Sequence, residues 1–232
     1  KKLQKKKMAT VGTVFTQKPR VRTPEEVVQS LFEPETREKL KFPRPENKRV
    51  WASLEKSKDE VIASVGDEMA RRDRRRSKTW VVLADGERAL RIRIEKLLDG
   101  KVIVILDLFH VLEKLWKASY TFHPEGSDEA KKWVRERALR ILQGEVSQVV
   151  KGMRQSATKR GLRGNKLKAI ESAASYFYAR RKYMKYDEYL EAGLPIASGR
   201  VEGACKNLIK DRMELSGMRW IKKTAESILK LR

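Results

Sequence analysis

Residues 80–110 read WVVLADGERALRIRIEKLLDGKVIVILDLFH, and this stretch decides the fold class. It contains two uninterrupted apolar runs, Trp80–Ala84 and Val102–Leu106, and each run ends at an aspartate. Short runs of this kind, rich in valine and isoleucine, are typical of strands buried in a parallel sheet. The segment 87–98 between them has apolar residues at helical spacing, and Gly100 follows it. The stretch therefore predicts a strand, a helix and a second strand in one sheet, which is an α/β fold.

Three elements are expected before this unit. Alternating residues, many of them β-branched, predict a strand over Met8–Phe15. Thr23, followed by Pro24 and a glutamate at the capping-box position, predicts a short helix up to about Phe32. Apolar positions between Val50 and Met69 lie near one face of a longer helix, so a helix is predicted there too.

The sequence after His110 is wholly helical in pattern, with glycines that separate the segments. Aromatic residues within it, among them Tyr176, are expected in the core, with base stacking as the alternative. The predicted helices cover Val111–Tyr120, Ser127–Leu142, Glu145–Ala157, Asn165–Tyr183, a short segment ending at Gly193, a helix from Ser198 through Met213, and a last one from about Lys222.

The charge of the chain predicts a polyanionic partner. Among 232 residues, 54 are Lys or Arg and 31 are Asp or Glu, which gives a net charge of +23. A field of this sign favours DNA or RNA through phosphate contacts. The basic run Arg71–Arg76 is either a solvated helix end or such a phosphate contact. One cysteine, Cys205, and the lack of a long apolar run indicate a cytoplasmic protein with no membrane span.

Two aspartates carry the first candidate chemistry. Asp85 and Asp107 each follow a predicted strand, at the edge where open α/β sheets bind ligands. If the strands are neighbours, the two carboxylates lie close enough to share a hard cation such as Mg²⁺; a strand between them would separate them. The alternative is that Asp85 belongs only to a turn and Asp107 only caps a helix. His110 lies one helical turn after Asp107, so the two side chains could hydrogen-bond or act on one phosphate.

A third acid stands in a cationic stretch. Glu202 falls in the first turn of the helix expected after Ser198, where the helix dipole favours an acid in any case. A lone acid among cations is unusual unless it binds a metal or forms an ion pair. The cations around it are Arg200, Lys206, Lys210, Arg212 and Arg219.

Several segments in order resemble the DDE transposases of bacterial insertion sequences, specifically the Kra-type family. The resemblance spans nearly the whole chain, and the ordered set is more specific than any one segment. The segments that carry it are Lys7–Val11, Arg22–Glu25, Val50–Leu54, Trp80–Gly86, Leu106–Glu113, Pro195–Lys206, Lys210–Met213 and Gly217–Trp220.

The resemblance implies an RNase H-like core with an all-helical insertion. Residues 1–115 would form the N-terminal part of the core, 116–195 the insertion, and 196–232 the helices that complete the catalytic core. Asp85 would be the second catalytic acid and Glu202 the third, and both would bind metal. Asp107 and His110 would be auxiliary residues, and the cations around Glu202 would bind DNA.

The resemblance also implies a function. A transposase of this type cuts and joins DNA by two-metal phosphoryl transfer with Mg²⁺, for which Mn²⁺ can substitute. Its partners would be the DNA of the element ends and of the target, and the full-length form would be a homo-oligomer associated with the nucleoid. The first catalytic aspartate of the family would lie before Lys7 and a C-terminal tail after Arg232, so the chain is expected to be inactive alone.

Three other functions fit the same residues. The chain could be a non-catalytic DNA-binding module derived from a transposase. It could be another RNase H-like nuclease, such as one that resolves branched DNA. It could also be an RNA-binding structural protein, since RNA presents the same phosphate charge.

Overall fold

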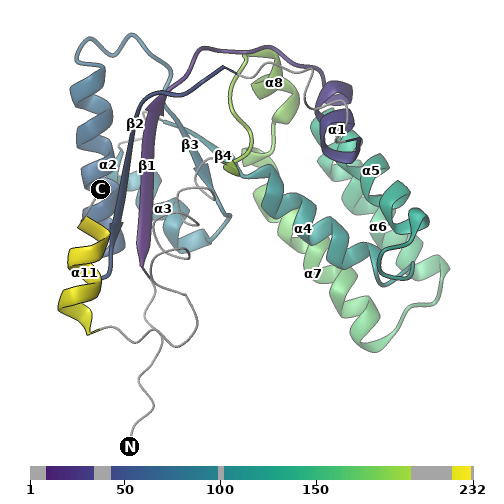
Figure 1. Ribbon diagram of the computed structural model, residues 1–232. Coiled ribbons are helices and arrows are strands. Elements are labelled where there is room, and N and C mark those ends of the chain that lie inside the picture. The colour runs from purple at the N-terminus through teal and green to yellow at the C-terminus, as the bar shows by residue number, and fades with distance from the viewer. Residues whose placement is uncertain (1–8, 34–42, 99–101, 200–220, 231–232) are drawn as a thin grey trace, which may run out of the picture.

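The computed structural model describes residues 9–33, 43–98, 102–199 and 221–230. Within these ranges the fold is mixed α/β, with two small two-stranded sheets and a larger helical part (Figure 1). The strands lie on one side of the molecule and most of the helices on the other. None of the helices in these ranges combines the length and the apolar character that crossing a bilayer requires.

The first sheet corrects one prediction from the sequence. Strand β1, Thr10–Thr16, pairs antiparallel with β2, Glu46–Ser53, and Thr13 lies opposite Val50. The segment from Val50 to Ser53 is thus a strand, and the prediction of a helix there was wrong. Helical spacing of apolar residues gives no information on a strand partner some 40 positions away along the chain, and that partner decides the conformation here.

Helix α2, Lys58–Arg72, begins after this strand. Its N-cap is Ser57, whose hydroxyl accepts from the Glu60 amide, while the Glu60 carboxylate accepts from the Ser57 amide. This reciprocal cap satisfies two amides that the first turn leaves open, and it defines where the helix starts. The same motif, with Thr23 and Glu26, begins α1, Pro24–Phe32, as the sequence predicted.

The second sheet confirms the predicted strand-helix-strand unit. Strands β3, Val81–Ala84, and β4, Ile103–Leu106, are parallel and paired in register, with Ala84 opposite Leu106. Helix α3, Arg88–Leu97, connects them. The two strands are direct neighbours, so the residues that follow them lie at one edge of the sheet.

The two sheets are linked through α2 rather than through backbone pairing. A side chain at Gly12 of β1 would meet Val65 of α2 at 3.0 Å, and one at Gly66 of α2 would meet Leu98 at 2.7 Å, so α2 packs closely on both sides. Among the described strands, β1 and β3 each have one hydrogen-bonded neighbour and one edge without a strand.

The helices of the helical part are α4, Leu108–Ser119; α5, Asp128–Leu142; α6, Val146–Lys159; α7, Gly164–Arg180; and α8, Tyr186–Glu191. These helices match the sequence prediction to within a few residues, and a 3₁₀ turn at Arg181–Tyr183 ends α7 earlier than expected. The helix predicted from Ser198 through Met213 lies almost wholly outside the described residues. Helix α1 packs against α5, and α11, Lys222–Lys230, packs against β2.

One apolar cluster joins β4 to the helical part. Ile105 of β4 and Val111 and Leu115 of α4 are fully buried, as is Phe177 of α7. Each fully buried side chain of this size contributes about 1.5–3 kcal/mol of transfer free energy. The C-terminal end of the parallel strand pair is therefore fixed firmly against the helices.

Candidate functional site

Asp85 and Asp107 lie at adjacent strand ends. The Asp107 amide donates to the Ala84 carbonyl oxygen at 2.9 Å, so the parallel pairing continues up to the two aspartates. From the sequence, the two aspartates were predicted to lie close together if the strands before them were neighbours. Strands β3 and β4 are neighbours, so this condition is met. Their surroundings differ sharply.

Asp107 is buried, with 2% of its surface exposed. Its Oδ1 accepts from the Phe109 amide at 3.0 Å, which caps helix α4, and its Oδ2 accepts from the Ser198 amide at 3.2 Å. The Leu108 amide donates to the Ile196 carbonyl beside them at 2.9 Å. Asp107 is thus a helix cap, as the alternative predicted, and it also fastens the segment 196–198 to the end of β4. Because the carboxylate is buried and each of its oxygens accepts an amide, its geometry favours a structural role over metal binding.

Asp85 is exposed and stands in a tight turn. Its Oδ1 accepts from the Glu87 amide at 2.9 Å, and Gly86 has a positive φ of 83°. This is a turn, as the alternative predicted, but Oδ2 of Asp85 receives no hydrogen bond from the residues that the structure describes. An exposed carboxylate with one uncommitted oxygen can take a hard cation such as Mg²⁺.

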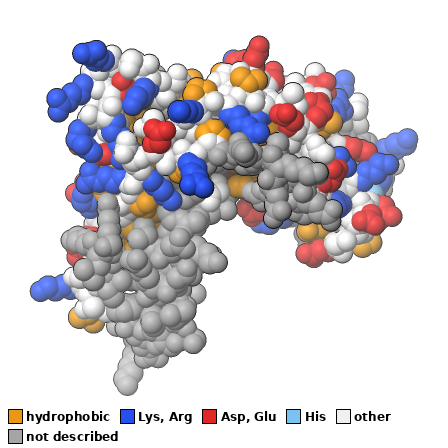
Figure 2. Space-filling model, turned by 45° about the horizontal axis from the view of Figure 1, so that its top comes forward, with side chains coloured by type: hydrophobic (Ala, Val, Ile, Leu, Met, Phe, Trp, Pro, Cys, Tyr) orange, Lys and Arg blue, Asp and Glu red, His pale blue; other side chains and the backbone are white. Residues whose placement is uncertain are grey.

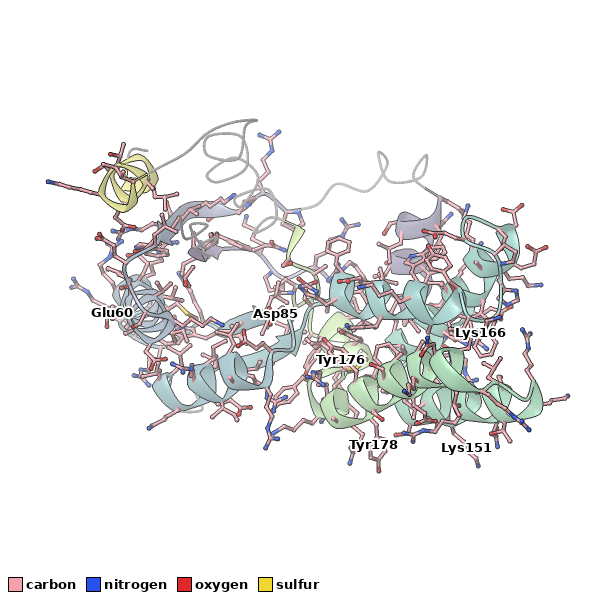
Figure 3. All side chains as sticks on the ribbon, turned by 90° about the horizontal axis from the view of Figure 1, so that it is seen from below. Glu60, Asp85, Lys151, Lys166, Tyr176 and Tyr178 are labelled. Atoms are coloured by element: carbon pink, nitrogen blue, oxygen red, sulfur yellow. The ribbon has the colours of Figure 1, made fainter. Side chains whose placement is uncertain are left out.

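Helix α7 holds this turn from the helical part. Tyr176 Oη donates to the Asp85 carbonyl oxygen at 3.0 Å, and Arg180 Nε donates to the Gly86 carbonyl oxygen at 2.8 Å. The Arg180 guanidinium also lies 4.0 Å from the centre of the Tyr176 ring. Figure 3 shows Tyr176 next to Asp85 where α7 approaches the strands. A Cβ at position 86 would overlap Tyr176 Oη and lie 2.7 Å from Leu106 Cδ1, so only glycine fits this position.

The pKa of Tyr176 is consistent with its role as a donor. Burial raises its pKa above the ordinary value of 10.0, Arg180 lowers it, and nearby carboxylates, Asp85 first among them, raise it. The phenol therefore stays protonated at neutral pH and keeps its hydrogen bond. Tyr186 makes a similar bond of 2.6 Å to the Leu106 carbonyl at the end of β4.

The contact of α7 with the turn was not predicted from the sequence. The helical spacing indicated Tyr176 as a core residue, and Arg180 was not among the candidate residues. The two residues are one helical turn apart, so they share a face, but that spacing does not identify what the face contacts. Of the other aromatic residues in α7, Phe177 is fully buried and Tyr178 is 49% exposed.

His110 does not approach Asp107 closely enough to bond. Its Nδ1 lies 3.6 Å from Glu113 Oε2 on the same helix, and both oxygens of Asp107 accept backbone amides. The two residues share the start of α4, as their spacing predicted, but the structure does not join their side chains. The imidazole is 40% exposed and faces Glu113 instead.

Glu202 and the cations around it, Arg200, Lys206, Lys210, Arg212 and Arg219, lie outside the described residues. Ser198, which Asp107 holds, precedes Glu202 by four positions, and four residues span at most about 14 Å between Cα atoms. In the described ranges, no three His, Cys, Asp or Glu side chains form a group able to hold a metal ion. A metal site at Asp85 would need an acid from elsewhere.

Comparisons with protein families, with curated proteins and with solved structures gave no match for this chain. What the chain does has to be inferred from its own residues, from their geometry at the ends of β3 and β4, and from its charge.

Proposed function

We propose that the chain is part of a DDE-type DNA transposase with an RNase H-like core, in which Asp85 and Glu202 bind divalent metal. The observation that carries the proposal is the exposed Asp85 carboxylate at the end of a parallel strand pair. It stands beside Asp107, which holds the segment that leads to Glu202. DNA is the partner that a net charge of +23 favours.

Two features of the fold support this reading. The chain leaves the sheet after β4, forms five helices in the described range 108–191, and returns to the end of β4 at Ile196. Such an excursion is what an all-helical insertion between the second and third acids requires. In addition, β1 and β3 each keep an edge without a described strand, and the proposal places the first catalytic aspartate on a strand that pairs there.

The residues present divide into ligands and supports. Asp85 fits a metal ligand because its carboxylate is exposed and one oxygen receives no hydrogen bond from the described residues. Asp107 fits a support because it is buried and both of its oxygens accept amides. When bound, a pair of Mg²⁺ or Mn²⁺ ions would activate a water or 3′-hydroxyl and stabilise the leaving oxygen. Tyr176 and Arg180 keep the Asp85 turn in place. Arg180 and Lys114, both close to the Tyr176 ring, add positive charge that would hold a DNA phosphate near Asp85.

Metal binding tests the proposal directly. The affinity for Mn²⁺, measured by electron paramagnetic resonance, should fall in Asp85→Asn and in Glu202→Gln, because each loses a ligand charge. Asp128→Asn is the matched control, since Asp128 is an acid in the first turn of α5, far from β3 along the chain. Mn²⁺ binding that neither Asp85→Asn nor Glu202→Gln changes would refute the proposal.

A non-catalytic DNA-binding module is the second candidate. It is favoured by the turn and cap hydrogen bonds of Asp85 and Asp107, which give both acids a structural role without a metal. DNA binding that is indifferent to Mg²⁺, and unchanged in Glu202→Gln, would support it over the transposase.

A further inference from the structure

The basic run that follows α2 divides into two parts with different surroundings. Arg71 and Arg72 belong to α2 and form ion pairs with the buried Glu68, at 2.7 Å and 2.6 Å. Arg74, Arg75 and Arg76 are exposed, and none of the described acids forms an ion pair with them. The first two arginines are therefore neutralised within the protein, and the last three face solvent.

These three arginines are part of an ordered turn. Residues 73–78, here called the basic turn, follow the end of α2, and the Arg76 amide closes them with a bond of 3.0 Å to the Asp73 carbonyl. Arg76 has a positive φ of 50°, which is uncommon for a residue with a side chain. A conformation of this kind persists where the surrounding contacts hold it.

The side chain of Asp73 supplies those contacts from the interior of the protein. It is buried, with 5% of its surface exposed, and its carboxylate accepts four hydrogen bonds. Oδ1 accepts from the Ser77 amide at 2.9 Å and from its hydroxyl at 3.2 Å. Oδ2 accepts from the Lys78 amide at 2.9 Å and from Trp80 Nε1 at 3.1 Å.

The charge of Asp73 is directed inward. Burial raises its pKa, but the hydrogen bonds it accepts outweigh burial and hold the pKa below the ordinary value of 3.8. The carboxylate is thus an anion at neutral pH and organises the turn without pairing with its arginines. The Arg76 guanidinium lies 5.8 Å from the centre of the Trp80 ring, and Asp73 holds the indole of Trp80.

We propose that the basic turn binds the phosphate backbone of duplex DNA. Arginine forks match phosphate oxygens, and three adjacent guanidinium groups on a fixed turn can contact successive phosphates. Lys and Arg side chains gather on this part of the molecule in Figure 2, over α2 and the strands, whereas both signs of charge alternate on the helical part. The inference rests on the proposed function only in taking DNA as the polyanion.

The place of the basic turn suits a DNA that also reaches Asp85. The turn precedes β3, and Asp85 follows it. From Lys78, the last residue of the basic turn, to Asp85 the chain spans at most about 23 Å, at about 3.3 Å per residue. This is the length of about seven base pairs at 3.4 Å each, so one duplex is long enough to contact both places.

A salt titration tests the proposal. Duplex DNA binding is measured by fluorescence anisotropy in EDTA, so that metal binding at Asp85 plays no part. The variant Arg74→Gln, Arg75→Gln, Arg76→Gln should bind about tenfold or more weakly at low salt, and its slope of log K against log salt should be smaller by about 2.7. The control changes Lys131, Lys132 and Lys151, three exposed cations of α5 and α6, to Gln. A slope equal to that of the wild type, or an equal loss in the control, overturns the proposal.

Asp73→Asn gives a test in which charge and geometry predict opposite signs. It adds one positive charge, so charge alone predicts unchanged or tighter DNA binding. If DNA binding requires an ordered turn, binding weakens instead. The side-chain amide of asparagine places N–H groups where one carboxylate oxygen of Asp73 accepted two hydrogen bonds, so those bonds are lost. Asp128→Asn has the same charge change at an exposed position and should not weaken binding. Thermal melting establishes whether the variants fold. If Asp73→Asn does not fold, the triple arginine variant, which keeps Asp73, tests the proposal.

The outcomes separate the two proposals. No DNA binding by the wild type refutes the proposed function. Binding by the wild type that the arginine variant retains refutes only the role of the basic turn. A single-stranded RNA that displaces the duplex at equal concentration contradicts the choice of DNA.

Discussion

The Tyr176 hydroxyl donates a hydrogen bond of 3.0 Å to the carbonyl oxygen of Asp85, which lies 91 residues earlier in the chain. Helix α7 thereby fixes the position of the turn that presents the Asp85 carboxylate, and Arg180 adds a second bond from the same helix. The helical part is thus joined to the candidate site through specific backbone contacts, in addition to apolar packing.

Removing the hydroxyl should loosen this turn. Tyr176→Phe should lower the free energy of unfolding by about 1 kcal/mol, the usual contribution of one hydrogen bond, and should weaken Mn²⁺ binding at Asp85. Tyr178→Phe, on the same helix but exposed, is the control and should change neither quantity. Denaturant unfolding and a metal titration measure the two effects. Equal results for both variants would count against a role of α7 in placing Asp85.

Gly86→Ala should be far more harmful than the same change at Gly126. Both glycines have positive φ, 83° and 79°, so each alanine incurs the conformational cost of about 1–2 kcal/mol. A Cβ at Gly126 meets open space, whereas one at Gly86 overlaps Tyr176 and Leu106. We expect the loss of stability at Gly86 to exceed that at Gly126 by about 1–3 kcal/mol, measured by denaturant unfolding. A loss no greater than that at Gly126 would mean that the turn moves freely.

Glu68 should make the stability of the protein sensitive to acid. Its pKa is lowered from 4.5 to about 2, first by the hydrogen bond from Arg71, against burial, and then by those from Arg72 and Arg49. Because the pKa of the folded state is the lower one, this stabilisation is complete above about pH 4.5 and is lost as the pH falls toward 2. Melting temperatures between pH 6 and 2 should fall less steeply in Glu68→Gln than in the wild type.

The exposed Glu125 gives the control for this experiment. Glu125→Gln should keep the pH profile of the wild type. If Glu68→Gln also has the pH profile of the wild type, the ion pairs of Glu68 do not stabilise the fold as their geometry indicates. Its partners are Arg49 of β2 and Arg71 and Arg72 of its own helix.

The sequence predicted the parts of the fold that local pattern controls. The capping box of Thr23 and Glu26 placed the start of α1, and two apolar runs that end in aspartates placed β3 and β4. The helix predicted at Val50 was wrong because the pairing of Val50 with Thr13 depends on a strand distant in sequence. A local pattern carries no information on such a partner.

In the candidate site, too, the features set by local pattern were predicted and those that depend on distant residues were not. The positions of Asp85 and Asp107 at neighbouring strand ends followed from the sequence, and so did the turn and cap as alternatives. The hydrogen bonds of Tyr176 and Arg180 could not be predicted, because they join α7 to a turn more than 90 residues away. The four bonds of Asp73 are short in range, yet the charge run alone did not indicate that an acid orders it.

Asp107 connects two points of the chain that are far apart in sequence. One of its oxygens receives the amide where the chain departs into the helices, and the other receives an amide 91 residues later, where the chain comes back. Departure and return therefore share a single anchoring carboxyl group. The loss of this one carboxylate would therefore release the start of α4 and the returning segment together, whichever helices lie between them.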